Sequence, residues 1–446
     1  MVYKDARVFI RIFLGFIVFC LISIGGYIAW LQKEVKIDQE VIESLDFVPT
    51  YDSKIKQAPF FYVYGFDAMA NIEPSQLGKQ SYDLDWHLYK ENPDTKQTSQ
   101  QFPEVEVQRI NYEKLWSKED QKLLVEVKKH LDSAESFDTD FWSENKREIE
   151  ALISHKKFLL NRYKQEISHQ NYQSLIQTPT ANPPYSLYYD IHTLFLINLY
   201  LNGSADGVLE YIHLKLNRLN ENLNSVEKAL VIAQVNQAID VLNVLAHRQS
   251  KKTQLPQLNI EQLSFEKQAA YEMRNAYYIF KSVDELLKQG HDKPSGLTKL
   301  WGKIYTPFAF NFNQSMNQAN SNYQPYIEVS KLSYLEFSVK INQIQLPQQR
   351  KWALSNNIGN ILNQVGSSTY WVNELLRPRL LNNKIQVFNI IHSGKNIDQE
   401  ISKKSQEGYV FLKNANQLCI ENPFEKRQKL NERLQQDSCV EIYSNH

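Results

Sequence analysis

The sequence predicts a mainly α-helical protein: one N-terminal transmembrane helix, then an all-α helical bundle or helix-pair array, and a small β-hairpin tail. Apolar residues recur at helical spacing through much of the chain. The clearest run comprises Val231, Val235, Ala238, Leu242 and Leu245. Glycine (14) and proline (15) are scarce in a chain of 446 residues, which disfavours an architecture of many short strands and turns. An uncharged stretch of 20 residues, 12–31, supplies the transmembrane helix.

The stretch 12–31 is predicted to cross a membrane once, because a helix of that length spans about 30 Å, the thickness of a bilayer's hydrocarbon core. Basic residues precede the stretch, whereas charges of both signs follow it. The positive-inside rule therefore places residues 1–11 in the cytoplasm and the rest of the chain outside. A cleavable signal peptide would have a shorter apolar core, and a lipoprotein signal would have a small residue, not Phe19, before Cys20. A buried core helix is the third alternative.

The three cysteines fit this topology. Cys20 lies in the apolar stretch, where a thiol behaves as a small apolar group. Cys419 and Cys439 are expected to lie in an oxidising compartment and to form a disulfide. That bond would close a loop of about 20 residues, which corresponds to roughly 3 kcal/mol in the chain-entropy model. Two unpaired thiols are the alternative.

The first part of the body is predicted to be extended, because five prolines between residues 49 and 103 disfavour regular helix. Its aromatic run 60–67 is expected to lie across the helical body, with a ligand-facing aromatic wall as the alternative. A helix capped by Ser117 follows, and a long, charged, solvated helix is expected over 141–173. The predicted segments are 1–11 (cytoplasmic), 12–31 (transmembrane), 32–116 (extended, rich in proline and aromatics), 117–178 (charged and helical), 185–400 (helical core) and 401–446 (disulfide-clipped tail).

The second half carries the stronger helical signals. Periodic apolar residues predict helices over 188–201 and 265–287, the first ended by Asn202-Gly203. The amide-rich segment 311–324 is expected to be polar and exposed. A later helix, continuing to 381, is expected to be interrupted at Pro378. Two β-prone segments, 408–412 and 439–443, predict a terminal hairpin, and no 34-residue repeat of the tetratricopeptide type is found.

No motif assigns a chemistry to the chain. Lys+Arg and Asp+Glu both number 50, and this balance argues against a nucleic-acid partner. Zinc, serine-hydrolase, penicillin-binding and phosphate-loop signatures are absent. The pairs Asp83/Asp85 and Asp138/Asp140 could hold a divalent cation only within a nucleotide-binding α/β domain, which the pattern does not predict. No catalytic residue is therefore assigned, and neither a cofactor nor a metal site is expected.

A resemblance starts at Tyr64-Gly65-Phe66-Asp67-Ala68, followed by Pro74 and Gly78-Lys79. This segment resembles one in uncharacterised proteobacterial membrane-anchored proteins, in which an aromatic-rich strand leads into a Gly-Phe-Asp-Ala-Pro element; Met69 stands at the proline position here. The run 360–362 and the tail between Cys419 and Cys439, with Asn422-Pro423-Phe424, are similarly placed. Together these cover about a third of the chain. The resemblance implies a Gram-negative inner-membrane location and carries no activity.

These observations lead to one expected function and one alternative. The expected function is a membrane-anchored periplasmic binding or scaffold protein of the cell envelope, held by its N-terminal helix and bound to an envelope protein partner. A toxin-neutralising immunity protein is one form of this function. The alternative is an envelope hydrolase acting on peptidoglycan or lipid, with carboxylates that converge only in the folded chain.

Overall fold

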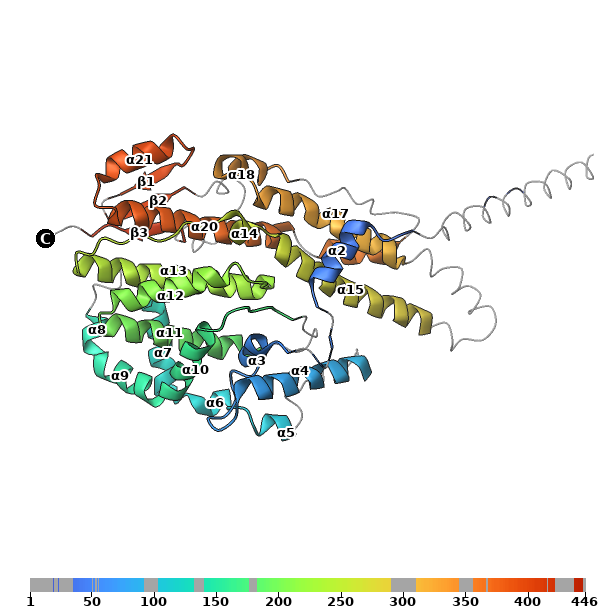
Figure 1. Ribbon diagram of the computed structural model, residues 1–446, viewed down its shortest axis with the longest axis horizontal. Helices are drawn as coiled ribbons and strands as arrows, with labels where there is room; N and C mark the ends of the chain where they lie inside the picture. Colours follow the sequence, from blue (N-terminus) through green and yellow to red (C-terminus); the bar gives the residue numbers. More distant parts are fainter. Residues whose placement is uncertain are drawn as a thin grey trace, which may run out of the picture. The chain divides into compact units, whose positions relative to one another are not determined.

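The computed structural model is mainly helical, with a small antiparallel sheet near the C-terminus (Figure 1). Two compact units, each discontinuous in sequence, make up the chain. The first unit contains Met1–Asp46, Met273–Tyr323 and Leu346–Ser367; the second contains Phe47–Glu272, Gln324–Gln345 and Ser368–His446. The structure describes residues 35–49, 51–52, 54, 56–91, 103–131, 140–175, 183–289, 310–344, 356–365, 368–414, 416–421 and 437–443, together with Phe19 and Ser23.

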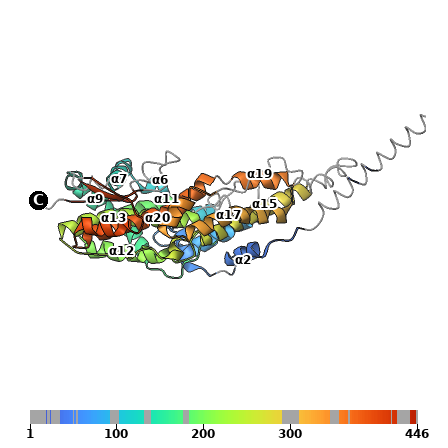
Figure 2. The same ribbon diagram turned by 90° about the horizontal axis from the view of Figure 1, so that it is seen from above.

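The first unit is built around helix α15 (Glu266–Gln289) and helix α17 (Phe312–Ser330), of which it holds the larger parts. Helix α2 (Gln39–Phe47) lies beside them (Figure 2), and α19 (Asn357–Val365) completes the described helices of this unit. A core cluster joins Val41 and Leu45 of α2 to Met273 and Phe280 of α15 and to Met316 of α17. Apolar side chains at helical spacing thus fix three segments that are far apart in the sequence.

The second unit begins with a series of helices between residues 58 and 167. These are α3 (Ala58–Tyr64), α4 (Pro74–Glu91), α5 (Pro103–Glu106), α6 (Tyr112–Leu115), α7 (Lys118–Leu131), α8 (Phe141–Glu144), α9 (Lys146–His155) and α10 (Lys157–Ile167). Ser117 begins α7 as predicted, because its hydroxyl accepts the N–H of Asp120 at 3.0 Å and its own N–H bonds the Asp120 carboxylate.

The later helices of this unit are α11 (Tyr185–Leu201), α12 (Ala205–Arg218), α13 (Ser225–Arg248), α14 (Ile260–Leu263), α18 (Tyr334–Lys340), α20 (Ser368–His392) and α21 (Ile397–Ser405). Helix α13 packs against both α12 and α20. Its N-terminus is a capping box, in which Asn224 accepts the N–H of Glu227 and the Glu227 carboxylate accepts the N–H of Asn224. The predicted all-α body is confirmed in this coarse form, and Gly203, at φ +61°, follows α11 as expected.

Within the described residues, α13 is the one helix long and apolar enough to cross a membrane, with a mean hydropathy of 1.5 in its best window. That window is 78 % buried inside the protein, so α13 is a core helix of the second unit. The predicted membrane-spanning stretch 12–31 lies outside the described residues, apart from Phe19 and Ser23. The structure gives it no support, and it stays a prediction.

The prediction that segment 32–116 is extended is wrong. Prolines begin helices in this segment instead of breaking them: Pro59 lies in the first turn of α3, and Pro74 and Pro103 are the first residues of α4 and α5. A proline in the first turn costs the helix no hydrogen bond, because the first N–H groups of a helix have no partner within it. The aromatic run 60–67 accordingly starts as helix α3 and is buried.

Three other helical predictions need correction. The expected single helix 141–173 is three helices, with bends at Asn145 and Lys156, and its side chains Arg162 and Glu166 are buried. The amide-rich segment, expected to be exposed, forms most of α17. Helix α20 continues through Pro378 without interruption.

The C-terminal tail contains three strands, β1 (Phe411–Lys413), β2 (Gln417–Ile420) and β3 (Cys439–Glu441), in the order β1-β2-β3. The predicted hairpin omitted the central strand β2. Both pairings are antiparallel, and Cys419 lies directly opposite Cys439. These two cysteines form the predicted disulfide.

Candidate functional site

The segment that carries the resemblance is a tightly packed helical corner between α3 and α4. A Cβ atom on Gly65 would overlap the carbonyl oxygen of Pro74, and one on Gly78 would overlap that of Phe61. Only glycine therefore permits this approach of the two helices. Between them, Asp67 accepts two hydrogen bonds from the buried guanidinium of Arg109, at 2.6 and 2.8 Å.

Arg162 of α10 fastens the same corner to the rest of the unit. Its guanidinium donates to the carbonyl oxygens of Phe66, Ala68 and Met69. The Tyr62 hydroxyl donates in return to Gln165 Oε1 of α10, at 3.1 Å. These contacts give the resembling segment a structural role: its polar residues satisfy backbone and side-chain groups that packing has removed from water.

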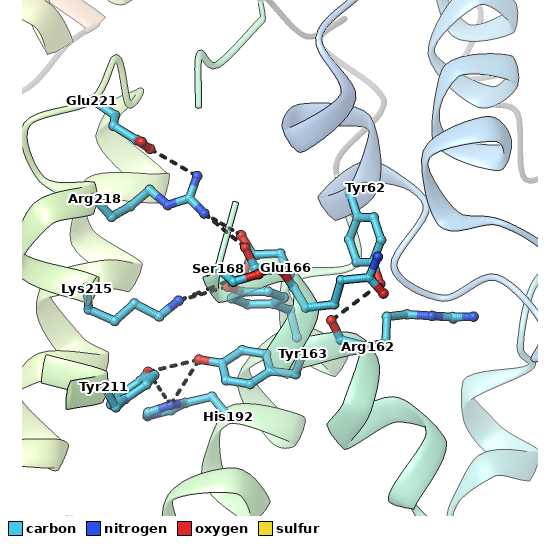
Figure 3. A network of polar contacts seen from close by, with 12 residues as sticks. Tyr62, Arg162, Tyr163, Glu166, Ser168, His192, Tyr211, Lys215, Arg218 and Glu221 are labelled. Carbon is cyan, nitrogen blue, oxygen red and sulfur yellow. Dashed lines mark hydrogen bonds and ion pairs between the residues drawn. The ribbon is translucent and has the colours of Figure 1, made fainter. Parts of the chain in front are cut away.

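Next to this corner lies the densest group of buried charges in the described chain, which we call the Glu166 network (Figure 3). Helix α12 presents Tyr211, Lys215 and Arg218 on one face, at i, i+4 and i+7, toward Glu166 of α10. Glu166 Oε1 lies 3.0 Å from Arg218 Nη2, and its Oε2 lies 3.9 Å from Lys215 Nζ. The Tyr188 hydroxyl of α11 donates to the same carboxylate.

Three tyrosine rings surround the ammonium group of Lys215. Its Nζ atom lies 5.1 Å from the ring centre of Tyr163, 5.2 Å from that of Tyr188 and 5.8 Å from that of Tyr211. Such rings attract a cation through their quadrupole, and the attraction grows when water is absent. The Lys215 ammonium thus occupies an aromatic cage of the kind that other proteins use for cationic ligands.

A chain of hydrogen bonds continues from the cage to His192. The Tyr163 and Tyr211 hydroxyl oxygens are 2.9 Å apart, and the Tyr211 oxygen lies 2.8 Å from His192 Nδ1. On its other side, His192 Nε2 lies 3.0 Å from Oε1 of Gln237 in α13. Burial, and then the charge of Lys215, lowers the pKa of His192 to about 3, so its ring is neutral.

The charges of the network balance one another. Burial by itself raises the pKa of Glu166, but Lys215, Arg218 and the Tyr188 hydrogen bond outweigh it and lower that pKa. Burial lowers the pKa of Lys215 to about 8, and Glu166 opposes this shift. Arg218 also pairs with Glu221 at 3.0 Å. Two carboxylates, the buried Glu166 and the partly exposed Glu221, therefore face two buried cations.

Chemically, the Glu166 network is closed. Glu166, Lys215 and His192 are each no more than 2 % exposed, and they bind one another, their neighbours or aromatic rings. No substrate atom could reach them without displacing α10 or α12. The arrangement ties α10, α11, α12 and α13 together, and we interpret it as a structural lock.

Comparisons with known proteins gave no match: no protein-family model, curated protein or solved structure matched the chain. The function is therefore argued from the residues alone.

A second acid–base group, also buried, lies where α13, α15 and α20 meet in the second unit. Burial, opposed by Arg377 and reinforced by the charge of Glu272, raises the pKa of Glu374 to about 7. Burial lowers the pKa of Lys228 to about 7. Lys228 Nζ donates to the carbonyl oxygen of Ser264 at 2.7 Å. A carboxyl group with a pKa near neutrality is suited to general acid–base work.

The residues singled out from the sequence have separate roles. Asp83 pairs with Lys79, whereas Asp85 accepts the Tyr64 hydroxyl hydrogen bond, so the pair does not share a ligand. Asp138 lies outside the described residues. Among the residues that the structure describes, no three His, Cys, Asp or Glu side chains are grouped as metal ligands. The sequence contained one indication of the Glu166 network: the polar residues Tyr211, Lys215 and Arg218 recur on the buried face of α12.

Proposed function

We propose that the chain is a single-pass inner-membrane protein whose N-terminus is cytoplasmic and whose helical body binds or scaffolds partners in the periplasm. The uncharged stretch 12–31 and its basic N-terminal flank support the anchor. The Cys419–Cys439 disulfide supports an oxidising compartment for the body. Tethering raises the effective concentration of such a body near membrane and wall partners.

One observation carries the binding role: apolar side chains are exposed around strand β1, which forms one edge of its sheet. Val410 and Leu412 are 52 % and 50 % exposed, and Leu335 and Val339 of α18 are 55 % and 51 % exposed. Leu335 lies against Gly408, and the Tyr334 and Tyr409 rings stack at 4.2 Å, so α18 and the start of β1 adjoin.

Strand β1 pairs with β2 on one side and with no described strand on the other. An exposed edge strand is a template for an extended polypeptide, and apolar side chains beside it add contact area. We therefore assign the occupant as an extended polypeptide segment with apolar side chains at alternate positions.

The binding proposal is tested in intact cells. The full-length protein carries a photo-cross-linking residue at Leu412, and the anchor stretch alone serves as the control bait. A reproducible cross-linked partner that is lost with Val410→Asp, and kept with an exposed charge change such as Glu261→Lys, would support the proposal. Equal cross-linking in both variants, or none in either, would refute it.

The anchor is tested separately. A reporter that is active only outside the cytoplasm, fused after residue 446, should be active, and the same fusion lacking residues 1–31 should not. Activity of the shortened fusion, or inactivity of the full-length one, would contradict the proposed topology.

A hydrolase remains the second candidate, and one observation favours it: the Glu374 carboxyl, with its pKa near 7, lies within electrostatic reach of Glu272. Glycosidic hydrolysis uses a pair of carboxyl groups, one of which acts as an acid with a raised pKa. Purified protein would be assayed on cell-wall and lipid substrates beside Glu374→Gln. Cleavage that Glu374→Gln abolishes, with unchanged helicity, would establish an enzyme; no cleavage by the wild type would remove this candidate.

A further inference from the structure

The chain that follows the predicted membrane span is fastened to α17 by asparagine side chains. Asn313 Nδ2 donates to the carbonyl oxygen of Val35 at 2.6 Å. Asn317 binds the same segment twice, donating to the Lys36 carbonyl at 2.9 Å and accepting the Asp38 N–H at 2.9 Å. Asparagines at i and i+4 on α17 thus hold backbone groups of residues 35–38. We call this contact the amide clamp.

The amide clamp lies close, along the chain, to the end of the predicted span. Only four peptide steps separate Leu31 from Val35, and a fully extended chain covers at most about 14 Å in four residues. If residues 12–31 cross the bilayer, Val35 is therefore held within that distance of the membrane-water boundary, and the start of α17 is bound to Val35 through Asn313.

The end of α15 belongs to the same part of the first unit. Ile37, Leu287 and Phe312 all pack against one core cluster, and the rings of Tyr277 and Phe312 lie 5.5 Å apart. The last turns of α15 thus lie beside the start of α17, where the amide clamp is.

An uncharged strip runs along this part of α15. It consists of Asn275, Ile279, Ser282 and Leu286, at i, i+4, i+7 and i+11. Ile279 and Leu286 are 46 % and 47 % exposed, although the apolar side chains of the opposite face are buried. Two exposed aliphatic side chains one above the other, without a charge between them, are costly to leave in water.

We propose that this uncharged strip of α15 rests on the lipid surface of the membrane that anchors the chain. The inference rests on the proposed function, because it needs the span at 12–31. The anchor delivers the strip to the bilayer, so two aliphatic side chains suffice where a free helix would need a larger apolar face.

The lack of charge on the strip defines the kind of lipid contact. None of Asn275, Ile279, Ser282 and Leu286 carries a charge. The contact made by the strip itself is therefore apolar and does not depend on anionic headgroups. It should form on neutral bilayers, and added salt should not release it.

The test uses the full-length protein with Cys20→Ala, so that a cysteine introduced at one position is the only free thiol. Spin labels at Ile279→Cys and Leu286→Cys are compared with one at Lys281→Cys, an exposed position of the same helix. In bilayer discs of neutral lipid, the strip labels should collide several-fold less with a water-soluble nickel complex, and more with oxygen, than the control label. Helicity by circular dichroism verifies that each variant is folded.

Two controls separate failure of the inference from failure of the proposed function. A membrane-impermeant maleimide should label Lys281→Cys in intact cells with a permeabilised outer membrane. If it does, and the three spin labels are equally accessible to nickel, the strip does not touch lipid although the topology holds. If Lys281→Cys reacts only after lysis, the topology is wrong and the inference falls with it. Equal nickel protection of a label at Val339→Cys, an exposed apolar position of α18, would also overturn it.

Discussion

Replacing Glu166 by glutamine tests the interpretation of the Glu166 network most directly. The carboxylate is 2 % exposed and faces Arg218 at 3.0 Å and Lys215 at 3.9 Å. Glutamine keeps the shape and removes the charge, so two buried cations would share only the partly exposed Glu221. Breaking a buried ion pair in this way costs about 3–5 kcal/mol of unfolding free energy.

Thermal unfolding, followed by circular dichroism, measures that loss. At roughly 2–4 °C per kcal/mol, Glu166→Gln should lower Tm by about 6–20 °C. Glu221→Gln is the matched control: it removes a carboxylate from the same Arg218 guanidinium, but its side chain is 19 % exposed. We expect Glu221→Gln to lower the unfolding free energy by about 1 kcal/mol.

The pH dependence of the Glu166→Gln variant gives a second readout. In the wild type, burial lowers the pKa of Lys215 to about 8, and Glu166 opposes this shift. Without Glu166 that pKa falls further, so the folded variant releases the lysine proton at a lower pH than the wild type does. Where the unfolded state binds more protons, stability rises with pH. The stability difference between the variant and the wild type should therefore narrow as pH rises toward about 8.

A double variant completes the test. Adding Lys215→Met to Glu166→Gln removes one unpaired cation and should recover part of the lost stability. A loss below about 1 kcal/mol in Glu166→Gln, or no recovery in the double variant, would refute the reasoning.

Three further predictions concern the second unit. Reducing the Cys419–Cys439 disulfide should lower the unfolding free energy by about 3 kcal/mol for its 20-residue separation, as denaturant titration with and without reductant would measure; no change would contradict a stabilising role. Gly78→Ala should lower the unfolding free energy by at least about 2 kcal/mol, because the added Cβ atom would overlap backbone atoms. The control Gly203→Ala, in open space at φ +61°, should lower it by about 1 kcal/mol. Equal losses would count against the close contact between the two helices. Because the pKa of His192 is lowered to about 3, its stabilising contribution is present above about pH 6.5 and is lost as pH falls toward 3; His192→Asn should flatten the acid limb of the stability–pH curve.

The helices that could be predicted are those whose apolar spacing is regular and whose ends carry ordinary stop signals. Helices α11 and α13 are of this kind, and Gly203 follows α11 in a left-handed conformation. The disulfide was predictable because Cys419 and Cys439 are the two cysteines outside the apolar stretch. These features depend on residues close together in the sequence, or on a choice with few alternatives.

The wrong predictions have a common physical cause: the structural role of the residue depended on partners far away in the sequence. Pro74 and Pro103 looked like helix breakers, yet each begins a helix. The asparagines of the amide-rich segment looked like solvated side chains, yet Asn313 and Asn317 bind a backbone segment nearly 280 residues away, at sequence separations of 278 and 281.

The Glu166 network could not have been assembled from the sequence. Its acid lies on α10, its bases lie on α12, and its tyrosines come from three helices. Local periodicity predicts which face of a helix is buried, but it does not say which polar side chains meet there.

The amide side chains of α13 have a consequence for how the protein is made. Gln234, Gln237 and Asn243 are buried in this helix, at 0 %, 6 % and 2 % exposure. If the body is exported, α13 passes through the translocation channel before it has a core to enter, and its mean hydropathy of 1.5 brings it near the composition of a true membrane span. Each amide makes lateral escape into lipid less favourable. The polar residues of a core helix would then keep the chain moving through the channel until it can fold.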